Sequence, residues 1–466
     1  MTEAEPIDLL IEGDWVISMD PDRAMVRNGA VAVRDGRIVD VGPSEAVATR
    51  WVATARVGGP GSVVIPGLVN AHQHLTGDRL ARSTIPDFIE SGEAIFTWAV
   101  PLHQAHRPDD DELSATCALV EAVGHGITFT VEAGTVGYPE RVLAAYDRVG
   151  VGGTLGSWGS DTAGLPWSGS VGQVIARQRD VLELTEGHDR VRGWVTLVGH
   201  DLMTDELVVA ASELAREAGT NLTFHLSPSD SDAAAYGART GLRPLVHLDR
   251  LGVLGRHVLV AHGVHVDDAE LDVLLRTEVA LAYCPWAYLR LGQGVAGAGR
   301  HADFLERGGR LALGCDAENA GDAVDVLRAA ALAAGLAKDV RRQPTRFGAH
   351  TALELATITG AEAIGMAGEL GSLEVGKRAD VVVLDATGAA STPSAPDPVM
   401  GMIWGSDGRA VTDVIASGRV VVANRTCVTV DIATLRAEAS EAQARLLRDA
   451  GLNPRPVWPV VGSDQP

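Results

Sequence analysis

Four histidines and one aspartate follow short apolar runs, at places where their side chains could act together on a metal ion. In chain order they are His72, His74, His225, His262 and Asp316. Residues two apart on a strand point to the same face, so the imidazoles of His72 and His74 can reach one ion. Imidazoles with one carboxylate suit a transition metal better than calcium or magnesium. A single histidine of this kind is usually structural, whereas five such residues at strand ends favour a metal centre.

The elements that would position these residues are repeated βα units. Short apolar runs alternate with longer amphipathic segments between residues 62 and 367. The predicted strands are 63–74, 126–134, 150–160, 191–200, 221–227, 257–264, 279–286 and 310–317. Eight βα units in roughly 250 residues predict an α/β fold of the (β/α)8 barrel type. In such a barrel the catalytic groups lie at the C-terminal ends of the strands, where the five residues fall.

The two ends of the chain have a different sequence pattern, which is typical of short β-strands joined by turns. Residues 1–61 contain short strands with hairpin signals at Asn28-Gly29 and Asp35-Gly36, and residues 368–430 repeat this pattern. We expect both segments to build one small β-sandwich, with the barrel inserted between them. Residues 431–466 are expected to form a C-terminal helix and tail.

Charge and composition exclude several classes of partner. The formal net charge of −22 would repel nucleic acid and anionic membranes. The four cysteines form no C-x-x-C pair, and the N-terminal segment has no signal-peptide pattern. No apolar run approaches the roughly 18 residues of a membrane span. A cytoplasmic protein with neither a nucleic-acid nor a membrane partner is expected.

Four segments carry a resemblance to a known family. The sequences GLVNAHQHL, FHLS, VLVAHG and GCDAEN resemble the signature positions of the amidohydrolase superfamily. The resemblance extends over nearly the whole chain. It implies a (β/α)8 barrel with a flanking β-sandwich, a metal that activates water, and assembly into a homodimer or larger homo-oligomer.

The lysine content bears on the number of metal ions. Many two-metal members bridge their ions with a carboxylated lysine on the fourth strand, but the only lysines here, Lys338 and Lys377, lie outside the predicted strands. The sequence is therefore similar to the single-metal branch of deaminases and triazine hydrolases. That resemblance implies one divalent ion, zinc by preference with cobalt, iron or manganese as alternatives. It assigns the ion to His72, His74, His225 and Asp316, gives His262 a hydrogen bond to water or an oxyanion, and makes Asp316 the catalytic base.

The chain departs from that branch after the fifth strand. The branch usually has a glutamate three residues after the histidine, which protonates a ring nitrogen, but Pro228 stands here. Asp230 or Asp232 could replace it, although acids in such a loop more often cap a helix. Amide, urea, carbamate and thiocarbamate carbons need no such acid, and the HQHL segment is similar to that of phenylurea and thiocarbamate (molinate) hydrolases.

We therefore expect hydrolysis of an amide-like C–N or C–S bond in a small uncharged substrate. Two alternatives stay open. One is an aminohydrolase or dechlorinase of a nitrogen heterocycle such as a purine, pterin or s-triazine. The other is a non-catalytic relative, which a complete ligand set disfavours.

Further polar and aromatic residues at the predicted strand ends are candidates for substrate contacts. They are Glu132, Trp158, Trp286, Tyr288 and Asn319, and Cys284, Phe88 and Trp98 could add an apolar wall. A capping role for Glu132 and core packing for the aromatic side chains are the alternatives.

Overall fold

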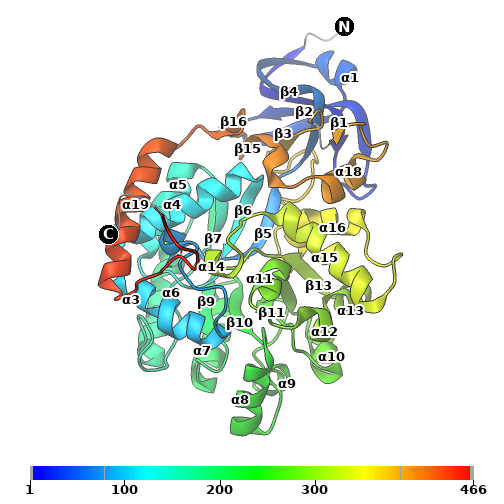
Figure 1. The fold of residues 1–466 in the computed structure, drawn as a ribbon. Coiled ribbons are helices and arrows are strands. Elements are labelled where there is room, and N and C mark those ends of the chain that lie inside the picture. Colours follow the sequence, from blue (N-terminus) through cyan, green and yellow to red (C-terminus); the bar gives the residue numbers. More distant parts are fainter. Residues whose placement is uncertain (1–3, 78, 389–390, 462–466) are drawn as a thin grey trace.

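A closed barrel of parallel strands forms the centre of the molecule (Figure 1). The structure, a computed structural model, describes residues 4–77, 79–388 and 391–461. The barrel strands are β5 (Leu68–Gln73), β6 (Ile127–Glu132), β7 (Gly152–Leu155), β8 (Val191–Gly193), β9 (Val195–Gly199), β10 (Leu222–Leu226), β11 (Val258–His262), β12 (Ala280–Tyr283) and β13 (Arg310–Leu313). Each pairs in parallel with the next along the chain, except between β8 and β9, and the ring closes between β13 and β5. The predicted (β/α)8 fold is confirmed.

Two seams complete the ring. The predicted fourth strand is divided into β8 and β9 at Trp194, whose N–H donates to Leu155 of β7 at 2.9 Å. The N–H of the next residue donates to Asn221, just before β10, so pairing passes from one neighbour to the other within this strand. At the second seam β13 lies beside β5, where Gln73 and Asp316 form an isolated parallel bridge.

Helices surround the barrel with their apolar faces against the strands (Figure 1). The segments that connect the barrel strands and follow the last one are η1 (Arg79–Ala81), α2 (Ser91–Glu93), η2 (Ala94–Ala99), α3 (Val100–Ala105), α4 (Pro108–Gly124), α5 (Pro139–Val149), α6 (Val171–Leu184), α7 (Asp205–Glu217), α8 (Asp230–Thr240), α9 (Pro244–Arg250), α10 (Asp268–Thr277), α11 (Pro285–Arg290), α12 (Val295–Ala298), α13 (His301–Glu306), α14 (Glu318–Gly321), α15 (Val326–Arg341), α16 (Ala349–Ala356) and α17 (Ile358–Ala363). The ends of α5 illustrate the sequence signals, because it begins with Pro139 and stops at Gly150 in the left-handed conformation. Among the described residues, no helix combines the length and apolar character needed to cross a bilayer.

The second region is a sheet built from both ends of the chain. Its strands are β1 (Glu5–Ile17), β2 (Met25–Arg34), β3 (Arg37–Pro43), β4 (Trp51–Pro66), β14 (Val381–Asp385), β15 (Val411–Ala416), β16 (Arg419–Ala423) and β17 (Thr426–Cys427). They form one continuous hydrogen-bonded sheet rather than two separate ones. Val31 of β2 and Ile415 of β15 nevertheless share one buried cluster, so the sheet folds over a common core, as a sandwich does.

Further helices among the described residues complete this region and the C-terminal end. They are α1 (Ser44–Ala48), α18 (Pro398–Gly405), which precedes the turn η4 (Gly408–Ala410), and α19 (Ile432–Asp449). The helix α19 packs against α4 on the outside of the barrel (Figure 1).

The change from sheet to barrel lies later than the predicted boundary at residue 61. Strand β4 continues to Pro66, so the predicted first barrel strand is divided between β4 and β5. The division falls at Gly67, where a Cβ atom would lie 2.1 Å from Oγ1 of Thr128. The Thr128 side chain approaches the Gly67 backbone so closely that only glycine fits there, and the apolar run across this position conceals the change of strand in the sequence.

A buried ion pair joins the sheet to the barrel. Nη2 of Arg378 lies 2.6 Å from Oδ2 of Asp380, and both side chains are buried. The Arg378 guanidinium also lies over the Phe129 ring of β6, and the Asp380 carbonyl accepts a hydrogen bond from Gly67. Because both charges are removed from water, loss of either partner leaves the other uncompensated.

We expect Asp380→Ala to destabilise the protein by about 3–5 kcal/mol, because Arg378 would remain charged and buried. The measurement is the thermal unfolding midpoint of the metal-loaded protein. The double variant Arg378→Met/Asp380→Leu should recover most of the loss, since it removes both charges. Glu217→Ala breaks the exposed pair with Arg179 and serves as the control, with little expected change. An unchanged midpoint in Asp380→Ala would contradict this role.

Candidate metal centre and active site

The five residues singled out from the sequence come together at the C-terminal mouth of the barrel. Nε2 of His74 lies 3.1 Å from Nε2 of His225 and 3.4 Å from Oδ1 of Asp316. Nε2 of His72 lies 3.6 Å from the same carboxylate oxygen. The His262 ring packs 5.2 Å from His72, measured between ring centroids. The residues that end strands β5, β10, β11 and β13 thus lie close together.

Neighbouring strands fix the orientation of two of these rings. Nδ1 of His225 lies 2.7 Å from the carbonyl oxygen of Val198, which can only accept, so Nδ1 carries the proton. The lone pair of His225 is then on Nε2 and faces His74. Nδ1 of His74 in turn lies 3.1 Å from Oγ1 of Thr135. Such outer hydrogen bonds to histidine are the usual support of metal ligands.

The donor atoms fit a divalent transition ion. His72 is buried, and among the described residues neither of its ring nitrogens has a hydrogen-bond partner. Burial holds the pKa of His72 and His225 below the ordinary value and lowers that of His262 to about 3, so the imidazoles are neutral, as ligands must be. Ligand atoms of His72, His74 and Asp316 all lie within 4.8 Å of one another. Three imidazoles and one carboxylate form a site for zinc or a similar ion.

The backbone turns sharply where Asp316 leaves its strand. Asp316 has φ 68°, and its N–H donates to the His72 carbonyl at 2.9 Å. The adjacent imidazoles of His72 and His74 hold the pKa of Asp316 well below its ordinary value, although burial alone would raise it. The carboxylate is therefore ionised and able to bind a cation.

His262 is held by two residues behind the mouth. Its Nδ1 lies 3.3 Å from the hydroxyl of Tyr288, and Nε2 of His301 lies 2.7 Å from its carbonyl oxygen. The Tyr288 hydroxyl also accepts from the N–H of Cys284 at 2.9 Å. Tyr288 is buried, so the structure gives it a positioning role rather than the predicted substrate contact.

Glu132 ends β6 below the mouth and is fully buried. Its Oε2 accepts from Gly134 at 2.7 Å and its Oε1 from Thr135 at 3.2 Å. Burial raises the pKa of this carboxyl to about 7. Both carboxylate oxygens accept hydrogen bonds from the turn that carries Thr135. The geometry therefore favours the capping role of Glu132 over a substrate contact.

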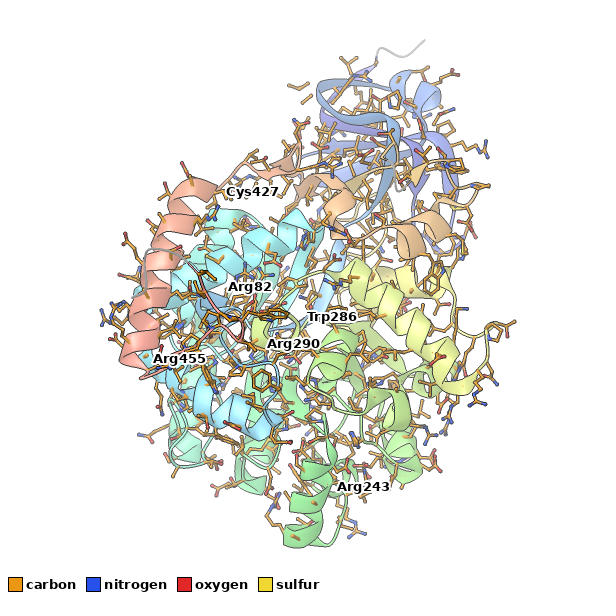
Figure 2. The ribbon with its side chains drawn as sticks, viewed as in Figure 1. Arg82, Arg243, Trp286, Arg290, Cys427 and Arg455 are labelled. Atoms are coloured by element: carbon orange, nitrogen blue, oxygen red, sulfur yellow. The ribbon has the colours of Figure 1, made fainter. Side chains whose placement is uncertain are left out.

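Trp158 and Trp286, both predicted to contact the substrate, have different surroundings. Among the described residues, the buried Nε1 of Trp158 has no hydrogen-bond partner, and its ring packs 5.0 Å from His103. Trp286 lies on α11 (Figure 2), where Nε1 donates to Gly321 at 2.5 Å and the Arg328 guanidinium covers the ring. The indole of Trp286 therefore holds the loop after β13 in place through its hydrogen bond to Gly321.

The proposed apolar wall is only partly formed. Phe88 is 75% exposed and Trp98 is half-buried, whereas Cys284 is fully buried beside His262. The long connection between β5 and α4 thus leaves the Phe88 side chain exposed to solvent.

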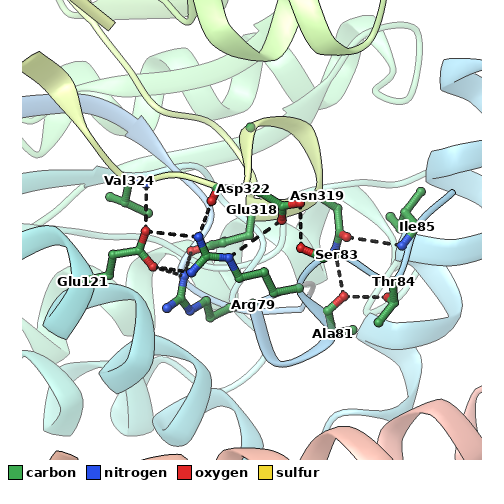
Figure 3. Close-up of polar contacts among 12 residues, drawn as sticks. Arg79, Ala81, Ser83, Thr84, Ile85, Glu121, Glu318, Asn319, Asp322 and Val324 are labelled. Atoms are coloured by element: carbon green, nitrogen blue, oxygen red, sulfur yellow. Dashed lines mark hydrogen bonds and ion pairs between the residues drawn. The ribbon is translucent and has the colours of Figure 1, made fainter. Parts of the chain in front are cut away.

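Asn319 belongs to a polar network between the first and last barrel loops (Figure 3). Its Nδ2 donates to Ala81 at 3.2 Å. In the same network Arg79 lies 2.6 Å from Glu121 and 3.3 Å from Glu318, the latter just beyond Asp316. These bonds hold the loop after β13 against the loop after β5, so Asn319 acts on the site through the loops.

A histidine–aspartate pair lies beside the metal centre. Nδ1 of His200, at the end of β9, lies 2.9 Å from Oδ2 of Asp232, which also accepts from the Ser227 N–H at 2.6 Å. The His200 ring stacks 5.6 Å from that of His225. Each residue could be singled out in the sequence as a strand end or a loop acid, but no spacing signal pairs them.

The two loop acids considered as replacements for the missing glutamate differ in position. Asp232 is buried against His200, whereas Asp230 is 85% exposed and pairs with His265. Only Asp232 therefore faces the site. His103, from the helix α3, is a residue that the sequence analysis missed, because it follows no strand and belongs to no motif.

Comparisons with known proteins agree with this architecture. A model of the amidohydrolase family matches residues 63–421, and one of a bacterial imidazolonepropionase-like composite domain matches residues 29–51. The 5-methylthioadenosine/S-adenosylhomocysteine deaminase of Syntrophobacter fumaroxidans is 28% identical over 434 residues, which are 91% of this chain and 95% of the relative.

Solved structures show the same fold. A zinc-bound adenosine deaminase from Xanthomonas campestris superposes with a TM-score of 0.90 and 27% identity, over 96% of this chain and 100% of that one. A zinc-bound atrazine chlorohydrolase from Arthrobacter aurescens TC1 gives 0.83 and 22%, over 93% and 100% respectively. The lysines Lys338, on α15, and Lys377, before β14, lie outside the barrel strands, which agrees with a single divalent ion. The chain is a metal-dependent hydrolase of carbon–nitrogen bonds and belongs to the amidohydrolase family.

Proposed function

We propose that this enzyme is an aminohydrolase of a purine-type nitrogen heterocycle and that it releases ammonia. The relatives are named as deaminases of adenosine-type nucleosides, which favours this alternative over the expected hydrolysis of a urea, carbamate or thiocarbamate. Our preference for those bonds depended on Pro228, which leaves the family's acid position without a proton donor. The proposal therefore requires another acid near the metal centre.

The observation that carries the proposal is the pair formed by His200 and Asp232. Asp232 binds Nδ1 of His200, and among the described residues no hydrogen-bond partner of Nε2 is found. The charge and hydrogen bond of His200 keep the pKa of Asp232 below its ordinary value despite burial. The Asp232 carboxylate accepts from Nδ1 and holds the His200 ring beside that of His225, which leaves Nε2 as the ring atom that could contact a substrate.

In the proposed reaction, the metal ligands act on the attacking water and His200 acts on the ring nitrogen of the substrate. A divalent ion bound by His72, His74, His225 and Asp316 would act as a Lewis acid that activates water and polarises the reacting carbon. Asp316 takes the proton of the attacking water and passes it to the leaving amine. His200 donates a proton from Nε2 to the ring nitrogen, which accepts the electron pair of the C=N bond as water adds to the carbon. The amine, protonated through Asp316, then leaves with the electron pair of the broken C–N bond.

The surroundings favour a small uncharged substrate. Trp158 offers an unused indole N–H beside the His103 ring, so a ring or a polar group of the substrate could be bound there. As part of the proposal we retain a cytoplasmic location and a homodimer or larger homo-oligomer. We also retain the absence of nucleic-acid and membrane partners.

The tight metal site should hold one ion per chain. His72→Ala and His225→Ala are each expected to lose both the ion and the activity, because each removes one of only four donors. The measurements are elemental analysis after dialysis and turnover of the same samples. Two tightly held ions in the wild type, or a full complement in either variant, would overturn this assignment.

Asp316→Asn tests the base. The amide cannot take a proton from water, so we expect the rate to fall by at least the 10²–10⁴-fold that general acid–base catalysis typically contributes. Turnover is measured on samples whose zinc content has been matched to the wild type. Near-normal turnover with the ion in place would assign the proton transfer to another group.

The His200–Asp232 pair is tested by ammonia release from a panel of substrates. It should contain adenosine-type nucleosides, free purines and pterins together with phenylureas and thiocarbamates. We expect His200→Gln and Asp232→Asn to reduce ammonia release by about 10²–10⁴-fold. Asp230→Asn is the matched control on the same loop, and it should retain activity because its carboxylate is exposed and faces His265.

Two results would count against the proposal. Turnover confined to phenylureas or thiocarbamates would restore the original preference based on Pro228. Ammonia release that is unaffected by both His200→Gln and Asp232→Asn would show that the acid is elsewhere.

A further inference from the structure

A thiol lies beside the metal centre where the sequence analysis expected only an apolar wall. Cys284 follows β12 and is fully buried. One ligand atom each from Cys284, His262 and Asp316 lies within 4.8 Å of the other two. Three donors bound to one ion at about 2.0–2.3 Å lie up to about 4 Å apart, so a small movement of these side chains would bring all three onto a single ion. The thiol is therefore part of a complete three-donor group.

This group overlaps in part with the donors assigned to the catalytic ion. Three sets of mutually close donors occur among the described residues: His72 with His225 and His262, His72 with His74 and Asp316, and His262 with Cys284 and Asp316. His262 and Asp316 therefore connect the thiol to the catalytic donors, and the two carboxylate oxygens of Asp316 can serve one ion each. Oδ1 faces His72 and His74, whereas Oδ2 lies 3.9 Å from His262.

The thiol packs against the same stretch of backbone as a catalytic donor. A Cβ atom on Gly314 would lie 2.8 Å from Sγ of Cys284 and 2.9 Å from Cβ of His72. The thiol therefore lies next to a ligand of the catalytic ion, where a second ion could share Asp316 with the first.

We propose that His262, Cys284 and Asp316 form a second and weaker cation site that takes a soft divalent ion such as zinc or cadmium. Asp316 then bridges the two positions through its two oxygens. Binding converts the thiol to a thiolate, forms a metal–sulfur bond and releases the thiol proton to solvent. A sulfur donor selects soft ions, so magnesium and manganese do not compete.

Occupation of this site would inhibit the enzyme. The second ion withdraws His262 from water or an oxyanion and reduces the ability of Asp316 to accept a proton. Repulsion between two divalent ions across one carboxylate makes the second bind less tightly than the first. The chain would therefore be active with one ion and inhibited by an excess of a soft one.

The test starts from protein that holds one equivalent of cobalt. A second equivalent of cobalt or cadmium is added, and binding is followed by calorimetry and by the near-ultraviolet sulfur-to-metal absorption band. We expect the second equivalent to produce this band in the wild type. Cys284→Ser and Cys284→Ala should lose the band and bind the second ion at least about tenfold more weakly, while both keep the first ion.

Cys117→Ala is the matched control. Cys117 lies on α4 outside the donor group, so this variant should behave as the wild type does. Absence of a sulfur-to-metal band in the wild type, or an undiminished second binding step in both Cys284 variants, would overturn the proposal. These readouts need no substrate, so they stand or fall independently of the proposed aminohydrolase activity.

Discussion

Closure of the parallel barrel between its first and last strands is the constraint on which the active centre depends. The backbone N–H groups of Cys315 and Asp316 both donate to the carbonyl of His72, across the seam between β5 and β13. These bonds place the last ligand of the chain beside the first. Gly314 permits the approach, because any side chain there would collide with Cys284 and His72. A shift in register between β5 and β13 would separate the carboxylate of Asp316 from the imidazoles, even if the other strands kept their pairing.

A second layer of contacts turns the ligands toward one another. The Val198 carbonyl, the Thr135 hydroxyl and the Tyr288 hydroxyl each fix the ring of one histidine, and each comes from a neighbouring strand end or helix. The network in Figure 3 acts further out, where Arg79 joins Glu318 to the loop after β5. The donors are therefore largely oriented before any ion binds, which reduces the cost of ordering them.

In the proposed reaction, the His200–Asp232 pair takes the place of the acid that the branch usually has. The usual acid of the branch stands three residues after the histidine of β10, where this chain has Pro228. The chain instead places a histidine at the end of β9 and supports it with a carboxylate from the helix after β10. An acid function belongs to a place around the substrate, and more than one strand end can reach that place. The absence of the motif glutamate therefore shows that this residue is not the acid, but it does not rule out the deamination reaction.

The sequence by itself determined the barrel, its strand order and the set of metal donors, because these depend on local signals. Apolar runs of strand length, the spacing of His72 and His74, and Asp316 after the last run can all be read one segment at a time. Only the tertiary structure decided which loop acid faces the site, that Tyr288 and Asn319 act through other residues, and that Cys284 joins a donor group. These outcomes depend on contacts between segments far apart in the chain, and no periodicity or spacing records them.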